Sequence, residues 1–233
     1  MKKITTFLLA FVVTCCMWQV NAQNYESLTE AFSAGVQMNT TTVTMSRQAV
    51  VTQVFNNAVT STYTDRATFD VAAGAGMFLE DFEGGPAPGT ICANCGPVSS
   101  AGNLGYPPGE ILDGIVVEQA NNPAGTLVIG TGWTVNTNPT VGSDTFVDFT
   151  RINFTNPVNA FGFDLYTIFG AENTDIRIFG AGGLIATFNV LAGNPSFFGA
   201  IADETITSVE IETTGSTQAE HIGLLAFGMT SAG

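Results

Sequence analysis

The sequence TFVDFTRINFTNPVNAFGFDLY, residues 145–166, predicts a strand, a turn and a second strand. The turn is expected at Asn156-Pro157, because proline lacks the amide that a sheet interior requires. A period of two places side chains on one face of a sheet, as in a half-buried antiparallel strand. On both sides of the turn, apolar residues hold this period: Ile152, Phe154, Phe161, Phe163 and Leu165.

Outward from this stretch, short apolar runs alternate with turn residues along the chain. Gly182-Gly183 predicts a hairpin between the strands on either side of it. Between Phe149 and Ile152 the apolar phase slips by one residue, which indicates a bulge or a strand that changes sheets. Strands separated by such turn signals predict an all-β fold, an antiparallel β-sandwich.

One short helix is expected before the first strand. Residues 64–74 carry Phe69, Ala72 and Ala73 at helical spacing, and Thr64 or Asp65 can cap the first turn. Residues 78–82 then predict the first strand of the sandwich.

The chain divides into three expected parts. Residues 1–22 have two lysines, an apolar run and the small-residue site Val20-Asn21-Ala22, which together predict a signal peptide. Cys15 and Cys16 raise the alternative of a lipid anchor, but Thr14 precedes them where a small residue is usual. Residues 23–62 are a Thr-, Ser- and Asn-rich extension, and residues 63–230 are the β-sandwich domain.

Charge excludes whole classes of partner. The chain has 6 basic and 20 acidic residues. Removal of residues 1–22 takes away both lysines and leaves 6 − 2 = 4 arginines, so the net charge becomes 4 − 20 = −16. Nucleic acid and anionic membrane surfaces both require a basic patch, which this composition does not supply. After residue 22 no apolar run is long enough to span a membrane. The acidity serves solubility or the binding of a divalent cation.

The segment 84–109 is a long loop rich in Gly and Pro, and it contains Cys92 and Cys95. In an exported chain, two cysteines three residues apart predict a disulfide. Zinc is not expected, because a zinc site needs about four ligands and the chain has a single histidine.

A carboxylate cluster is the best candidate for a cation site. Glu80, Asp81 and Glu83 are close in sequence, and strand alternation places Asp81 and Glu83 on one face. Calcium takes six or more oxygen ligands, so other acids would have to join them. The candidates are Asp113, Asp203 and Glu204. We expect no other cofactor.

Three aromatic residues are candidates for a carbohydrate site: Trp133, Tyr106 and Tyr166. Trp133 lies in the polar segment GTGWTVNTNPTVG, where a ring face beside amides and hydroxyls suits a sugar. The alternative is that these rings pack at one end of the core.

Catalysis is not indicated. A Ser-His-Asp triad would have to use His221, and no G-x-S-x-G motif supplies the serine. We interpret His221 as a polar residue of a strand edge. A pair of carboxylates could serve a glycosidase, but many acid pairs occur in this chain.

Four segments together resemble a jelly-roll-like β-sandwich module of secreted bacterial proteins, of the kind often found with PEP-CTERM sorting tails. They are DRATFDVAAGAGMFLEDFEGG (65–85), FTRINFTNPVNAFGFDLY (149–166), FFGAIADETITSVEIETTG (197–215) and HIGLLAFG (221–228). The resemblance implies the fold and a secreted, extracellular or cell-surface location, and no specific activity. Residues 229–233 show no sorting tail, and Gly223 and Leu224 stand where similar modules have the Asp and Asn associated with a structural calcium.

From these observations we expect a secreted, non-catalytic β-sandwich protein that binds extracellular polysaccharide or acts in adhesion. The alternative is a structural or protein-interaction domain that binds a surface protein, and a glycoside hydrolase is the third hypothesis. The carbohydrate hypothesis requires Trp133 or Tyr106 to be exposed over a polar groove, whereas the interaction hypothesis requires buried aromatics and an exposed sheet face or edge.

Overall fold

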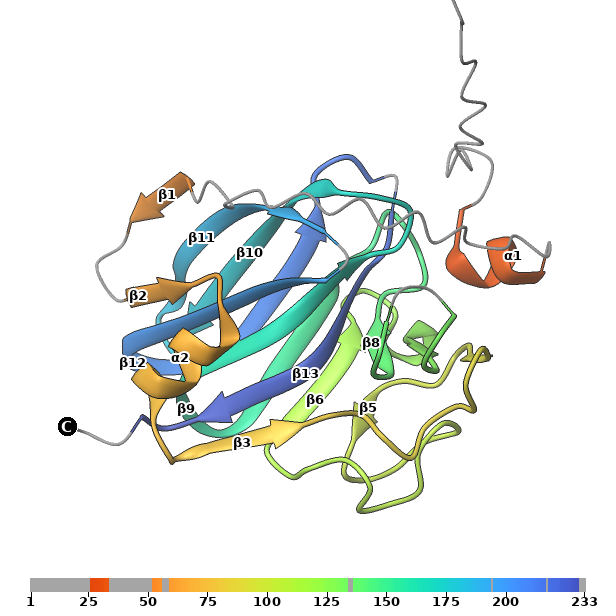
Figure 1. The fold of residues 1–233 in the computed structure, drawn as a ribbon, viewed down its shortest axis with the longest axis horizontal. Coiled ribbons are helices and arrows are strands. Elements are labelled where there is room, and N and C mark those ends of the chain that lie inside the picture. The colour runs from red at the N-terminus through yellow and green to blue at the C-terminus, as the bar shows by residue number, and fades with distance from the viewer. Residues whose placement is uncertain are drawn as a thin grey trace, which may run out of the picture.

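The computed structural model describes residues 26–33, 52–55, 59–133, 136–193, 195–216 and 218–230. The predicted signal peptide lies outside these residues. Every strand pair is antiparallel, and the fold is an all-β sandwich (Figure 1). The helices and strands are α1 (Leu28–Ser33), β1 (Thr52–Phe55), β2 (Val59–Tyr63), α2 (Arg66–Ala73), β3 (Met77–Glu80), β4 (Ile91–Cys92), β5 (Val98–Ser99), β6 (Ile115–Gln119), the 3₁₀ turn η2 (Pro123–Gly125), β7 (Leu127–Ile129), β8 (Thr140–Gly142), β9 (Thr150–Thr167), β10 (Glu172–Gly180), β11 (Gly183–Ala192), β12 (Ser196–Thr213) and β13 (Glu220–Gly228).

Two long neighbouring strands, β9 and β12, run through both layers of the sandwich. Each has 18 residues and an exposed triplet near its middle, at 155–157 in β9 and 203–205 in β12. The register between the two strands shifts beside these triplets, where Val158 pairs with Ile206 but Asn153 pairs with Ser208. Bulges of this kind bend a strand and let it change sheets at a corner.

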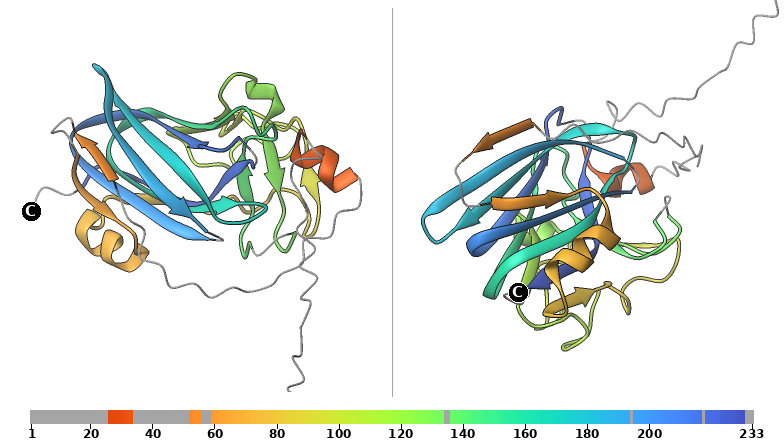
Figure 2. Two further views of the ribbon diagram at one scale, coloured as in Figure 1. Left: turned by 90° about the horizontal axis from the view of Figure 1, so that it is seen from above. Right: turned by 60° about the vertical axis from the view of Figure 1, so that its left-hand side comes forward.

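The bends divide the pairing into two layers (Figure 2). In the first layer, β11, β10, the end of β12, the start of β9, β6 and β5 follow one another, and β1 pairs with β11. In the second layer, β2, the start of β12, the end of β9 and β13 follow one another. On its other side β13 pairs with β8 and, further along, with β3, while β7 and β4 continue beyond β8.

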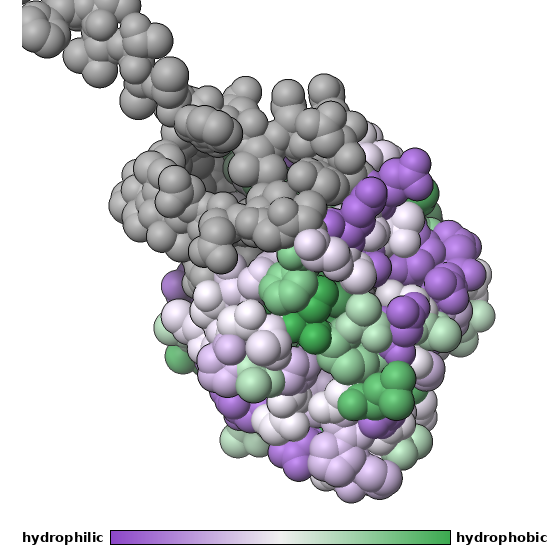
Figure 3. All heavy atoms as spheres, turned by 90° about the vertical axis from the view of Figure 1, so that its right-hand side faces the viewer, coloured by the Kyte–Doolittle hydropathy of each residue, from purple (hydrophilic) through white to green (hydrophobic). Residues whose placement is uncertain are grey.

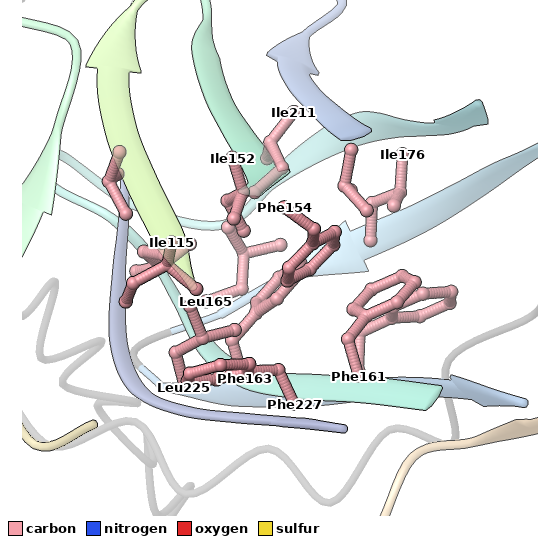
Figure 4. Close-up of a cluster of buried hydrophobic side chains, with 14 of the residues drawn as sticks. Ile115, Ile152, Phe154, Phe161, Phe163, Leu165, Ile176, Ile211, Leu225 and Phe227 are labelled. Atoms are coloured by element: carbon pink, nitrogen blue, oxygen red, sulfur yellow. The ribbon is translucent and has the colours of Figure 1, made fainter. Parts of the chain in front are cut away.

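The core lies between these layers, and the apolar period predicted from Ile152 to Leu165 is confirmed there (Figure 4). Burial of one such side chain contributes roughly 1.5–3 kcal/mol. Rings from both long strands pack together, as shown by Phe161 and Phe198, whose centroids lie 6.1 Å apart. The five predicted core residues are all buried in one cluster: Ile152, Phe154, Phe161, Phe163 and Leu165.

Helix α2 covers the outer face of the second layer. Asp65 caps it, as the sequence predicts. The Asp65 carboxylate accepts a hydrogen bond from the Thr68 amide at 2.8 Å. Phe69 packs over Gly199, where an added Cβ would lie only 2.7 Å from the ring. Glycine at this position therefore lets the helix approach the sheet closely.

The structure corrects several expected boundaries. Residues 145–149 form a turn, and β9 continues through Asn156-Pro157, because the bend at that point tolerates proline without ending the strand. Strand β1 and all of β2 except Tyr63 fall within the predicted extension 23–62. The sheet therefore begins before residue 63, and α2 does not precede its first strand. The loop 84–109 contains the short strands β4 and β5, which pair with β7 and β6. The hairpin at Gly182-Gly183 is confirmed. The jelly-roll form of the sandwich stays a prediction.

Candidate functional site

A groove opens beside the bend of β9, where the strand on one side of β9 changes from β6 to β13. Before its bend, β9 pairs with β6, and after the bend it pairs with β13. Strands β6 and β13 therefore belong to different layers, and the space between them lies beside the bend. The groove that opens there has a volume of about 430 Å³, in the size range of ligand pockets.

The floor of this groove is part of the hydrophobic core. Val158 and Phe227 line it and are each only 2% exposed. Its rim carries the large apolar side chains of Phe78, Leu112 and Met229, which are 61%, 37% and 48% exposed. We call this space the apolar groove, lined by Gly76, Phe78, Leu112, Asp113, Asn156, Pro157, Val158, Phe227, Gly228 and Met229.

A second depression continues the apolar groove on the other side of Asp113 and Asn156, two exposed residues that line both spaces. Its volume is about 390 Å³. We call it the polar groove, because Ser99, Ser100 and Thr155 add hydroxyl groups to its lining. The two grooves together can take an elongated ligand with an apolar part and a hydrogen-bonding part.

Glu80 fixes the wall between β3 and the loop that carries Leu112. Its carboxylate accepts hydrogen bonds from the amides of Phe82, at 2.6 Å, and Leu112, at 2.8 Å. Glu80 is only 3% exposed, and this burial raises the pKa of its carboxyl group despite the two amide donors. The position of Leu112 on the rim thus depends on a buried side chain of β3.

The other acids near Glu80 are exposed and carry no ion-pair partner among the described residues. They are Asp81, Glu83, Glu110 and Asp113. The three arginines of the described chain, Arg66, Arg151 and Arg177, are all ion-paired elsewhere. The end of β3 is consequently a surface of unopposed negative charge.

The expected calcium pair does not form a cage. Asp81 and Glu83 follow the end of β3, and the Asp81 carboxylate accepts a hydrogen bond from the Glu83 amide at 3.0 Å. Between them Phe82 adopts a left-handed backbone with φ of 57°, so the strand alternation assumed for this pair is wrong. Over the described ranges, no three His, Cys, Asp or Glu side chains converge on a common point.

Tyr106 and Tyr166 are buried, so their expected role as sugar-stacking rings is wrong. Each is 1% exposed. The Tyr106 hydroxyl donates to the carbonyl of Phe82 at 2.9 Å, and burial raises its pKa. Tyr166 packs with Leu28 and Phe146 in a second cluster, where burial raises the pKa of its hydroxyl to about 12. Both tyrosines hold loops onto the sandwich.

Trp133 is half-buried, and its indole packs on that same second cluster. Its ring centroid lies 5.5 Å from the ring of Phe32 in α1. On the face at the α1 end, small hydrophobic patches lie between polar side chains (Figure 3). This packing agrees with the alternative expectation for Trp133, a ring that caps one end of the core.

Two further sequence features have structural roles. Cys92 and Cys95 form the predicted disulfide, and Cys95 is buried in the core. His221 is wholly buried inside β13 rather than at a strand edge, with Nε2 at 3.0 Å from the Ser143 carbonyl oxygen and Nδ1 at 3.5 Å from the Thr140 hydroxyl. Burial lowers the pKa of His221 to about 4, so the imidazole is neutral at pH 7 and Nε2 donates to Ser143.

The apolar groove could not be predicted from the sequence. Phe78 was expected in a strand, and neither Leu112 nor Met229 belongs to a motif. The one available signal is the Asn156-Pro157 pair, which marks the bend beside the groove.

No protein-family model, no curated protein and no solved structure matches this chain. Among the described residues, neither helix is long and apolar enough to cross a membrane.

Proposed function

We propose that this chain is an exported, non-catalytic interaction domain that binds a segment of another protein in the apolar groove. The observation that carries the proposal is the exposure of large apolar side chains around a floor of core residues. Phe78, Leu112 and Met229 stay partly in water above Phe227. Exposed apolar surface of this kind, rimmed by polar residues, is typical of binding sites for proteins.

A peptide suits the groove better than a sugar does. Sugars stack on flat aromatic faces, and the three aromatic residues expected to provide them are buried or half-buried. The one aromatic side chain on the rim, Phe78, packs at 5.8 Å from Phe227. Leu112, Pro157 and Met229 add apolar side chains beside the polar Asp113 and Asn156. These apolar side chains match aliphatic or aromatic side chains of a protein ligand.

Export is supported by the residue pattern of the first 22 positions and by the disulfide between Cys92 and Cys95. An oxidising compartment keeps such a bond closed. The extracellular location, the cell surface and the bacterial origin implied by the resemblance are parts of the same proposal.

The proposal is tested by selecting, from a random peptide-display library, peptides that bind the full chain. Selected peptides are then measured against Leu112→Ser and Phe78→Ser, which remove rim contacts. The matched control is Leu104→Ser, because Leu104 is 84% exposed and does not line the groove.

We expect the two rim variants to weaken selected peptides by about tenfold, or 1.4 kcal/mol, and the control to bind as wild type does. The proposal fails if the library yields no groove-dependent peptide. A glycan array that shows polysaccharide binding lost in Trp133→Ala would replace it with the carbohydrate hypothesis.

A further inference from the structure

Strand β3 lies at an open edge of the second layer. Its only strand partner in the described chain is β13, along Met77–Glu80, so the backbone groups on its other side face no strand (Figure 1). Such an edge can pair with an extended segment of another chain. Phe78 and Leu79 are 61% and 55% exposed and point to opposite faces of the strand.

The two faces of β3 lead to different surroundings. Phe78 lines the apolar groove and packs on Phe227, whereas Met77, on the same face as Leu79, packs on the α2 cluster. A segment that added beside β3 would direct every second side chain toward the apolar groove, because strand side chains alternate. The intervening side chains would lie beside Leu79 on the outer face.

Charge identifies the chemistry of that segment. The exposed carboxylates of Asp81, Glu83, Glu110 and Asp113 surround the end of β3 and the groove, and no described cation opposes them. Complementary charge directs encounter and suppresses wrong partners. A second copy of this chain would bring the same negative charge, at a formal net charge of −14, against this edge.

We propose that the partner is an extended, lysine- or arginine-rich segment of another protein, which adds as an antiparallel strand to β3 and places alternate apolar side chains in the apolar groove. This inference rests on the proposed function and adds the binding mode and the charge of the partner. Main-chain hydrogen bonds supply affinity in this mode, and the pocket supplies specificity.

The experiment uses short synthetic peptides and the full chain, with binding followed by fluorescence anisotropy. The first peptide alternates valine and lysine. The second alternates valine and glutamate, and the third is the first peptide with N-methyl groups on alternate amides. Methylation removes the donors for strand pairing and leaves the side chains and charges in place.

We expect the lysine peptide to bind, and the glutamate and N-methylated peptides to bind at least about tenfold more weakly. Asp81→Asn and Asp113→Asn should each weaken the lysine peptide about two- to fivefold, as for exposed ion pairs. The control variant is Glu26→Gln, which removes an exposed carboxylate beside α1. Salt at about 1 M, where charges are screened within about 3 Å, should remove the difference between Asp113→Asn and wild type.

Equal binding of the N-methylated peptide overturns strand addition, and equal binding of the glutamate peptide overturns the basic partner. Both results leave the proposed function standing if library peptides still depend on Leu112. Sedimentation experiments test whether the chain dimerises at this edge. If the chain forms a dimer and Leu79→Lys abolishes it, the occupant of the edge is a second copy of the chain and the inference is overturned.

Discussion

Acid should destabilise this protein through His221, a wholly buried side chain of β13. Its folded-state pKa of about 4 lies below the ordinary value of 6.5. At pH values between 4 and 6.5, His221 is therefore protonated in the unfolded chain and neutral in the folded chain. The contribution of neutral His221 to the free energy of unfolding is therefore fully present above pH 6.5 and is lost as the pH drops toward 4. Below pH 4 the titration of His221 lowers the stability no further.

The magnitude follows from the size of that pKa difference. A difference of about 2.5 units corresponds to about 3 kcal/mol at 1.36 kcal/mol per unit. Screening by solvent does not reduce this figure, because the ring contacts no water. Loss of about 3 kcal/mol is a large part of the stability of a typical domain.

Glu220 has the opposite effect and must be removed from the comparison. It is also wholly buried, and burial raises the pKa of its carboxyl group well above 4.5. As the pH rises through 4.5, the unfolded chain ionises this carboxyl first, so the stability contributed by Glu220 falls with rising pH. The two neighbours thus offset each other in wild type.

The assay compares Glu220→Gln with the double variant that also carries His221→Gln. Free energies of unfolding in urea, followed by circular dichroism, are measured from pH 4 to 7. The first variant should lose about 3 kcal/mol more than the second between pH 6.5 and 4. Parallel curves for the two proteins over this range would show that His221 titrates normally and that the reasoning is wrong.

Three further predictions concern stability, each measured by urea unfolding. Glu80→Ala leaves the Phe82 and Leu112 amides without their acceptor and should cost about 2 kcal/mol, and unchanged stability would contradict the role of Glu80 in fixing the groove wall. Replacement of Cys92 and Cys95 by Ala opens a four-residue loop and should cost about 2 kcal/mol, with wild type in reducing agent as the matched comparison. Phe149→Ala removes a ring that packs against two arginine side chains and should cost about 1–2 kcal/mol, and a loss below about 0.5 kcal/mol would contradict this.

The sequence was informative where local pattern decides the structure. A period of two identified Ile152, Phe161 and Leu165 as core residues, because alternation alone fixes the face of a strand. The cap at Asp65 and the hairpin at Gly182-Gly183 also follow from local backbone preferences. Each of these features is determined by residues within a few positions of one another.

Features that depend on distant segments could not be predicted. The apolar groove exists because β6 and β13 pair with different halves of β9. No local sequence pattern predicts which strand pairs with which half. The burial of Tyr106 likewise depends on Phe82, 24 residues away, because the Phe82 carbonyl accepts a hydrogen bond from the Tyr106 hydroxyl. Residue type indicated an aromatic contact, but the long-range pairing decided what the ring contacts.

The two bent strands also make the layers a single cooperative unit. Because β9 and β12 supply hydrogen bonds to both layers, neither layer can separate without breaking a strand of the other. Amide hydrogens of β10 in one layer and of β13 in the other should therefore exchange with solvent through the same global opening. A force applied to either layer would therefore meet the resistance of the whole sandwich.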